Sequence, residues 1–200
     1  MSAAPELMAT DADADYVWLE REQAQELHTF CTSAVDGLFQ TPDYARTVIR
    51  AAEPDLTYDD VDYYMRLRLT RQQMLTRTSP PLVTAVLDEA VLHRVVSGPD
   101  VMATQVRHLQ DQAQRPNVEM QILPFSDGDL TSSEVSFRLF TLPEPLSRVV
   151  CIDASTGVLY VEPPGTDRFV TKYDTLREKA LSTEDTIEFL DRFADTIEKA

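Results

Sequence analysis

The sequence predicts an α+β fold, in which a single domain holds a mixed, largely antiparallel sheet of about five strands with helices before, within and after it. Three observations lead to this prediction. Helical patterns come first, strand patterns with one intervening helix follow, and helical patterns close the chain. The length of 200 residues suits one domain with its own core. The chain has only 5 glycines, too few for a many-turned all-β fold.

The N-terminal part is predicted to hold an arm and a first helix. Residues 1–15 are small and acidic, and we expect a disordered arm there. The folded effector-like domain is then expected over residues 16–200. Its first element is a predicted helix over residues 16–31, because Trp18 and Leu27 are apolar residues within a helical pattern.

Two further helix starts carry capping residues. Thr41 precedes a proline and an aspartate, which suit the first turn of a helix, and this helix is expected to end at Pro54. Thr57 is followed three residues later by Asp60, which is the spacing of a capping box. The second helix is therefore predicted to begin after Thr57 and to run to about Arg77.

This second helix breaks its own polar and apolar pattern. On a helical wheel, Arg68 and Arg71 fall within a wide apolar arc, whereas Arg66 and Arg77 fall outside it. A buried guanidinium group without a partner is costly, so a partner is required. That partner is either a carboxylate of the protein or an anionic group of a ligand.

The remaining elements follow from apolar runs and from alternation. A continuous apolar run predicts a buried strand over residues 82–87, and alternating side chains predict another over residues 118–123. Three more strands are predicted over residues 135–142, 148–153 and 158–162, and residues 154–157 are expected to form a hairpin turn between the last two. Helices are predicted over residues 88–94 and 99–114, and from Asp167 and Ser182 onward.

Charge and composition limit the kind of partner. The chain carries 34 acidic and 18 basic residues, so duplex DNA repels it and direct nucleic-acid binding is not expected. We see neither a signal-peptide pattern nor the roughly 18 apolar residues of a membrane span, and we expect a cytoplasmic protein without membrane contact. Cys31 and Cys151 are expected to be buried thiols rather than a disulfide.

Several groups of residues match one pattern that extends over most of the chain. They are Leu19 to Glu22, residues 37–46, Arg68 with Arg71 and Gln72, residues 86–92, and residues within 115–125. Together they resemble the C-terminal effector domain of actinobacterial XRE-type (helix-turn-helix), antitoxin-like transcriptional regulators. Asp36 departs from the pattern, because the family usually has proline there. The chain before Tyr16 is too short for the DNA-binding head, so we expect a stand-alone copy of the effector domain.

The resemblance implies a regulatory or ligand-binding module. In this family the head binds operator DNA, and the C-terminal domain is thought to bind something that modulates the head. We therefore expect this chain to bind a small molecule or a small partner protein and to act indirectly on transcription. A homodimer is one further arrangement left open. The site is expected between the arginine helix and the sheet, at Trp18, Tyr64, Arg68, Arg71, Asp88 and Glu89.

Each expected site residue also has a purely structural interpretation. Arg68 and Arg71 can form buried ion pairs with Asp88 or Glu89 that hold the helix on the sheet. Asp88 can instead cap the short helix that follows it. Aromatic residues can wall an apolar pocket or fill the core, and those in question are Trp18, Phe39, Tyr63 and Tyr64.

A second hypothesis is a stand-alone enzyme of a natural-product pathway that reuses the same pocket. Glu89 and His93 are four residues apart, so they can share a helix face as acid–base partners, and Arg71 can hold an anionic group. No nucleophile elbow, dinucleotide fingerprint or phosphate loop is found in the sequence. The histidines and cysteines lack metal-ligand spacing, so neither a metal nor a cofactor is expected.

A third hypothesis is an interaction protein that competes with full-length regulators for a shared partner.

Overall fold

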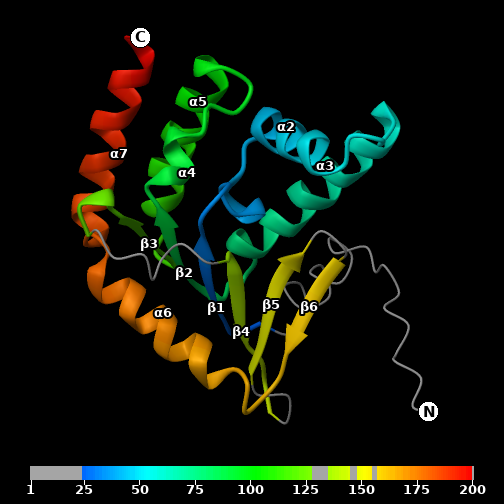
Figure 1. Cartoon of the computed structure of the whole chain (residues 1–200), viewed down its shortest axis with the longest axis vertical. Helices are drawn as coiled ribbons and strands as arrows, with labels where there is room; N and C mark the ends of the chain where they lie inside the picture. The colour runs from blue at the N-terminus through cyan, green and yellow to red at the C-terminus, as the bar shows by residue number, and fades with distance from the viewer. Residues whose placement is uncertain (1–23, 128–134, 145–147, 155–156, 200) are drawn as a thin grey trace.

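A six-stranded mixed sheet forms the centre of the computed structural model, which describes residues 24–127, 135–144, 148–154 and 157–199 (Figure 1). The strands are β1 (Glu26–Cys31), β2 (Leu82–Asp88), β3 (Val118–Leu123), β4 (Phe137–Thr141), β5 (Arg148–Ala154) and β6 (Gly157–Val161). They lie in the order β3-β2-β1-β4-β5-β6. The β1–β2 and β2–β3 pairs are parallel, and the other three pairs are antiparallel. The predicted α+β class is confirmed, with one strand more than expected.

Helices precede, interrupt and follow the strands of the sheet. The α-helices are α2 (Pro42–Ala52), α3 (Tyr58–Gln72), α4 (Ala90–His93), α5 (Pro99–Ala113), α6 (Asp167–Lys179) and α7 (Thr183–Glu198). Short 3-10 helices join some of the elements, and they are η2 (Gly37–Phe39), η3 (Gln73–Thr76) and η4 (Phe125–Asp127). All of these helices after β1 fall within or close to segments predicted from helical spacing or capping residues, apart from η2 and η4.

Thr41 and Thr57 are the N-caps of α2 and α3, as predicted, but only Thr57 makes the side-chain capping bond. Thr57 Oγ1 accepts the Asp60 amide at 3.2 Å, and Asp60 Oδ2 accepts the Thr57 amide at 3.0 Å, so the capping box before α3 is present. Thr41 is the N-cap of α2, but its side chain makes no capping hydrogen bond. α3 ends at Gln72, and η3 continues the turn to Thr76, close to the predicted end.

The strand β1 corrects the helix that was predicted over residues 16–31. Residues 26–31 are extended, with β2 as a parallel neighbour and β4 as an antiparallel neighbour. Leu27 and Cys31 are buried on one face of the sheet, and Phe30 is buried on the other. A short strand that is buried on both faces lacks a clear period of two, so hydrogen bonding along both edges, rather than local pattern, determined its structure.

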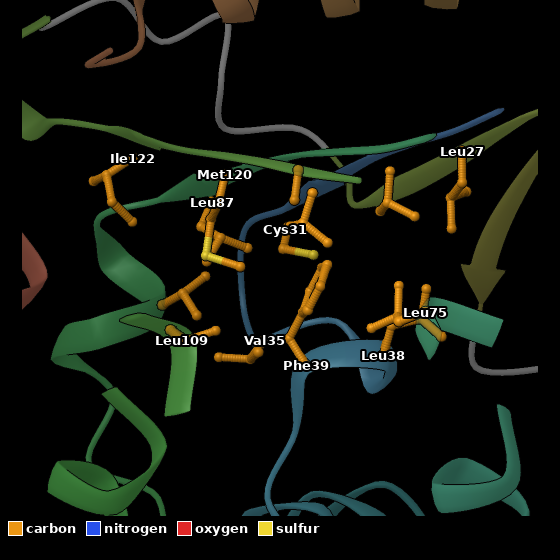
Figure 2. Close-up of a cluster of buried hydrophobic side chains, with 14 of the residues drawn as sticks. Leu27, Cys31, Val35, Leu38, Phe39, Leu75, Leu87, Leu109, Met120 and Ile122 are labelled. Atoms are coloured by element: carbon orange, nitrogen blue, oxygen red, sulfur yellow. The ribbon is translucent and has the colours of Figure 1, made fainter. Parts of the chain in front are cut away.

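One face of the sheet supports the larger core. Side chains of β1, β2 and β3 point from this face toward η2, η3 and α5, as Figure 2 shows. Phe39 of η2 and Leu109 of α5 lie opposite Leu87 and Met120 of the strands, and all four are fully buried. The residues just after β1 are thus fixed against the sheet, and α2 and α3 continue from them.

α6 covers the other face, and α7 runs beside α5 (Figure 1). Tyr173 and Leu176 of α6 pack on Phe30 of β1 in the second core cluster. The turn between α6 and α7 is bonded to the edge strand β3, because the Leu181 amide donates to the Ile122 carbonyl at 2.9 Å. The sheet is therefore covered by helices on both faces.

Several other expectations can be compared with the described part of the chain. Both cysteines are buried free thiols, as expected. No described helix has the length and apolar character that crossing a membrane needs. The predicted arm over residues 1–15 lies outside the described residues, and so do residues 155–156 at the tip of the predicted β5–β6 turn.

Candidate functional site

The connector between β1 and α2, residues 35–41, is held from one side by a buried glutamine of α5. Gln105 is fully buried. Its Nε2 donates to the Phe39 carbonyl, and its Oε1 accepts the Thr41 amide, both at 2.7 Å. One side-chain amide therefore satisfies two backbone groups that would otherwise be buried without partners.

Helix α3 holds the same connector from the other side. Gln72 Nε2 donates to the carbonyls of Gly37 at 2.9 Å and Gln40 at 2.8 Å. Gln40 in turn donates from Nε2 to the Val35 carbonyl at 2.6 Å. The connector is therefore bonded to both α3 and α5.

A buried ion pair joins Asp36 of the connector to Arg138 of β4. Asp36 Oδ2 accepts hydrogen bonds from Arg138 Nε of β4 at 2.7 Å and from Thr29 Oγ1 of β1 at 2.9 Å. Asp36 Oδ1 accepts the Leu38 amide at 2.9 Å, which caps η2. Arg138 also reaches Asp153 of β5, with 3.1 Å between Nη1 and Oδ2. Both oxygens of the Asp36 carboxylate thus accept hydrogen bonds, which compensates for its burial at 3% exposure.

Electrostatics at this point favour the ionised carboxylate. Burial by itself would raise the pKa of Asp36, but Arg138, the Leu38 amide and Arg71 outweigh burial and hold the pKa below its usual value. The neighbouring thiol responds in the opposite sense. Burial, together with the negative charge of Asp36, raises the pKa of Cys31 to about 12. The surroundings therefore favour a charged carboxylate at Asp36 and a protonated thiol at Cys31.

Both arginines within the apolar arc of α3 point toward the connector. Arg68 Nη1 donates to Gln40 Oε1 at 2.8 Å, and Arg71 is 5% exposed. Both lie close to Gly37, because a Cβ built there would stand 3.7 Å from Arg68 Cδ and 3.9 Å from Arg71 Nη1. We refer to Asp36, Gln40, Arg68, Arg71 and Arg138 as the α3 junction.

The two carboxylates predicted as partners for these arginines lie in a different group. Asp88 Oδ1 accepts the amide of Ala90, the first residue of α4, at 2.8 Å, while Glu89 is the N-cap of that helix. Glu89 Oε1 lies 3.1 Å from His93 Nε2, and Glu89 Oε2 accepts the Phe125 amide at 2.8 Å. No ion pair between described residues joins either carboxylate to the arginines, so the predicted ion pair is wrong. Both carboxylates lie at the end of β2, and their hydrogen bonds go to Ala90, His93 and Phe125.

The aromatic residues considered for a pocket do not form one group. Phe39 is fully buried in the main core. Tyr63 is 49% exposed, and its ring contacts the ring of Tyr64, with 5.4 Å between centroids. Trp18 lies outside the described residues. Tyr64 is partly buried and lies on α3, the helix that carries Arg68 and Arg71.

Several residues that bond to the connector or lie within it were not predicted from the sequence. Asp36 is an acidic residue among the mostly apolar residues 35–39, which is a signal that a polar partner lies nearby. Arg138 is a charged residue within an apolar strand pattern, which is a second signal. The pairing of these two could not be read from the sequence, because they are 102 positions apart and meet only through the β1–β4 register. Gln105 gave no signal, since a helical glutamine is ordinarily exposed.

The structure is a single α+β domain with a mixed sheet, in which arginine and glutamine side chains bond α3 to the connector that follows β1. The chain belongs to the DUF5753 family, described as a domain of unknown function, whose model matches residues 13–192. The match includes all six strands and the α3 junction. No curated protein and no solved structure matches the chain.

Proposed function

We propose that this chain is a cytoplasmic regulatory binding module, equivalent to the effector domain of XRE-type, antitoxin-like regulators. It binds a small molecule or a small partner protein at the α3 junction, through an anionic group of that ligand or partner. Binding changes how α3 is held, and the module acts indirectly on transcription through that change. Nucleic acid is not its direct partner, given the acidic balance of the chain.

The polar attachment of α3 is the observation that carries this proposal. Among its 15 residues, the buried ones are Val61 and Arg71. A helix packed on a sheet ordinarily presents an apolar stripe. Buried charged groups add little net stability, and their replacement by apolar residues is often neutral or stabilising. Their presence under α3 therefore favours a role in binding or switching over a role in stability.

The chemistry of the junction suits an anionic group. Guanidinium groups bind carboxylates and phosphates through paired, charge-assisted hydrogen bonds. An anion that reaches Arg68 and Arg71 exchanges their present contacts for these stronger ones. Because Arg68 donates to Gln40, and Gln72 donates to two connector carbonyls, the exchange alters the bonds that hold residues 35–41. The effect then extends to α2, which begins directly after the connector.

Native mass spectrometry of the gently purified chain tests this proposal, followed by thermal-shift measurements with small carboxylic acids and phosphates. We expect wild type to retain an added mass, or to be stabilised by at least one acid. The variant Arg68→Ala/Arg71→Ala is expected to lose both effects. A small added mass identifies a small molecule, and an added mass in the range of a polypeptide identifies a partner protein.

A matched control comes from the same helix. Arg66 lies on α3 but is exposed, so Arg66→Ala removes one arginine charge from the same helix without touching the junction. We expect this variant to bind as wild type does, and circular dichroism verifies that both variants are folded. Equal loss of binding in the Arg66 variant would mean that general charge is responsible. A wild-type chain that binds neither a partner nor any acid would refute the proposal.

The runner-up function is an enzyme, and one observation favours keeping it. The predicted Glu89–His93 pair is formed, and the His93 ring is flanked by Phe125 and Phe193 at centroid distances of 5.2 and 5.0 Å. An acid–base pair beside aromatic rings at a strand end is a plausible arrangement for proton transfer. Arg71, the third residue of this hypothesis, belongs to the α3 junction instead.

The enzyme hypothesis has its own test. If the Glu89–His93 pair transfers a proton, Glu89→Gln and His93→Ala each abolish turnover of any substrate found by screening the wild type, while Arg68→Ala/Arg71→Ala mainly weakens its binding. Turnover that survives both substitutions at the pair would remove these residues from consideration.

A further inference from the structure

The described part of the chain begins beside the end of α3. Ala24, its first residue, is 2% exposed and belongs to the main core cluster together with Met74 and Leu75 of η3. Arg77, which follows η3, donates from Nη2 to the Ala24 carbonyl at 3.1 Å. The residues before Ala24 therefore join the fold at the end of the helix that carries the junction arginines.

These two parts of the sequence carry opposite charge. Residues 63–87 contain four arginines and no acidic residue, although the whole chain has a formal charge of −16. Residues 11–22 contain five acidic residues and one arginine. The α3 junction follows the same pattern, since three of its side chains are guanidinium groups and Asp36 is its carboxylate. An acidic segment thus leads directly to the most basic stretch of an acidic chain.

The acidic side chains are near enough along the chain to reach the junction. Glu20 precedes Ala24 by four residues and Asp15 by nine. At about 3.3–3.6 Å per residue, they can lie up to roughly 14 and 30 Å from Ala24. The junction arginines of α3 precede Arg77 by six and nine residues, which is roughly 10 and 15 Å along the helical turns. Both distances are within this reach.

We propose that residues 15–22 are an internal ligand of the α3 junction. Their carboxylates, those of Asp15, Glu20 and Glu22, pair with the arginines of α3 and compete with an external anion for them. This inference rests on the proposed function, because it names the group that an external ligand displaces. Charge-assisted hydrogen bonds to guanidinium groups are the shared chemistry of both competitors.

Attachment to the same chain makes the segment an effective competitor. A group tethered by a short stretch of chain is present at an effective concentration in the millimolar range. A free acid therefore displaces the segment only when it binds the arginines well enough to overcome that concentration. The segment consequently sets a threshold, so that weakly bound anions do not occupy the junction.

A spin label on the segment tests the docking without any ligand. The substitution Ala14→Cys places the label next to Asp15, and the two native cysteines are buried, so we expect labelling at the new cysteine alone. The label should broaden the amide signals of the second half of α3 far more than those of α6, which packs on the opposite face of the sheet. Equal broadening of α3 and α6 would overturn the proposal.

Neutral side chains separate docking by charge from mere attachment to the same chain. In labelled Asp15→Asn/Glu20→Gln/Glu22→Gln, the tether is unchanged but the three carboxylates are absent. We expect this segment variant to lose most of the broadening of α3. Broadening as strong as in the labelled wild-type segment would contradict the proposed pairing.

A matched control removes the same kinds of carboxylate elsewhere. The variant Asp174→Asn/Glu178→Gln/Glu188→Gln also replaces one aspartate and two glutamates, at exposed positions of α6 and α7. With the label at position 14, we expect it to keep the broadening of α3. Equal loss in this control would show that the overall charge of the chain, rather than the segment, is responsible.

Competition is measured separately, with inorganic phosphate as the probe and the amide signals of α3 as the readout. We expect phosphate to bind the unlabelled segment variant roughly tenfold more tightly than wild type, which is the factor for a junction that the segment occupies nine-tenths of the time. Equal affinities would contradict the competition. Phosphate that binds neither protein would count against the proposed anion site instead, and the label measurement still decides whether the segment docks.

Discussion

Arg138 of β4 donates from Nε to Asp36 Oδ2 across 2.7 Å, and Asp36 is 3% exposed. The β1–β4 register places Arg138 directly opposite Thr29, which donates to the same carboxylate oxygen. A single carboxylate thus joins two strands to the connector that leads into α2.

The first prediction concerns the coupling of this pair. Arg138→Met leaves the carboxylate of Asp36 buried without its strongest partner, and we expect a loss of about 3–5 kcal/mol in the free energy of unfolding. Urea unfolding followed by circular dichroism measures it. The double variant Asp36→Pro/Arg138→Met removes the buried charge as well. Since Asp36 has a φ of −56°, which proline adopts, much of the loss should be recovered.

A double variant no more stable than Arg138→Met would contradict the coupling. It would mean that Arg138 stabilises the fold through contacts other than Asp36, and that the carboxylate does not depend on the guanidinium group.

The second prediction is a pH dependence that originates in Asp36. Burial opposes ionisation, but Arg138 and the Leu38 amide keep the pKa of Asp36 below the usual value of an aspartate. The folded state therefore takes up this proton at a lower pH than the unfolded state does. The stabilisation is complete above about pH 4 and is lost as the pH falls through the folded-state pKa.

Unfolding measured at several acidic pH values checks this effect against Asp36→Asn. The asparagine variant is expected to be less stable than wild type near neutral pH, and to lose less stability in acid. Identical acid profiles for the two proteins would show that Asp36 does not contribute.

The third prediction concerns the buried glutamine of α5. Gln105→Leu keeps the volume but leaves the Phe39 carbonyl and the Thr41 amide without their partner. We expect a loss of about 1–3 kcal/mol for each buried group that stays unsatisfied. Gln110 on the same helix is a suitable control, because its bond to Asp191 is at the surface. Gln110→Leu should change stability by no more than about 0.5 kcal/mol. Equal losses would argue against a special role for Gln105.

The fourth prediction concerns thiol reactivity. Cys31 and Cys151 are buried, and burial raises the pKa of Cys31 to about 12. Because the thiolate is the reactive form, neither residue should be alkylated by iodoacetamide in the folded protein at mildly alkaline pH. Both should react fully in denaturant. Mass spectrometry counts the adducts, and rapid labelling of the folded chain would show that the sheet opens around these residues.

Local patterns predicted most elements of the fold. Thr57 with Asp60 predicted the start of α3, and alternation over residues 118–123 predicted β3, because capping and amphipathic alternation are local properties. β1 was missed for a physical reason. Leu27 and Phe30 lie on opposite faces, and both are buried, so the strand carries no polar face from which its period can be seen.

The candidate site was predicted only in part. The helical wheel correctly assigned Arg71 to the inner side of α3, because periodicity fixes the direction of a side chain. It could not identify the partner. Arg68 contacts Gln40, while Glu89 contacts His93, and which element lies across from α3 depends on strand order and register. Side-chain partners over long sequence distances are tertiary information.

Hydrogen–deuterium exchange tests the binding site at the α3 junction most directly. It compares the wild-type chain with and without the molecule that native mass spectrometry or the acid screen identifies. Slower exchange in α3 and in residues 35–41 on binding is the predicted result, because the ligand contacts Arg68 and Arg71 and alters the bonds to the connector. Slower exchange confined to residues 89–93, with α3 unchanged, would contradict the proposal and favour the Glu89–His93 pair.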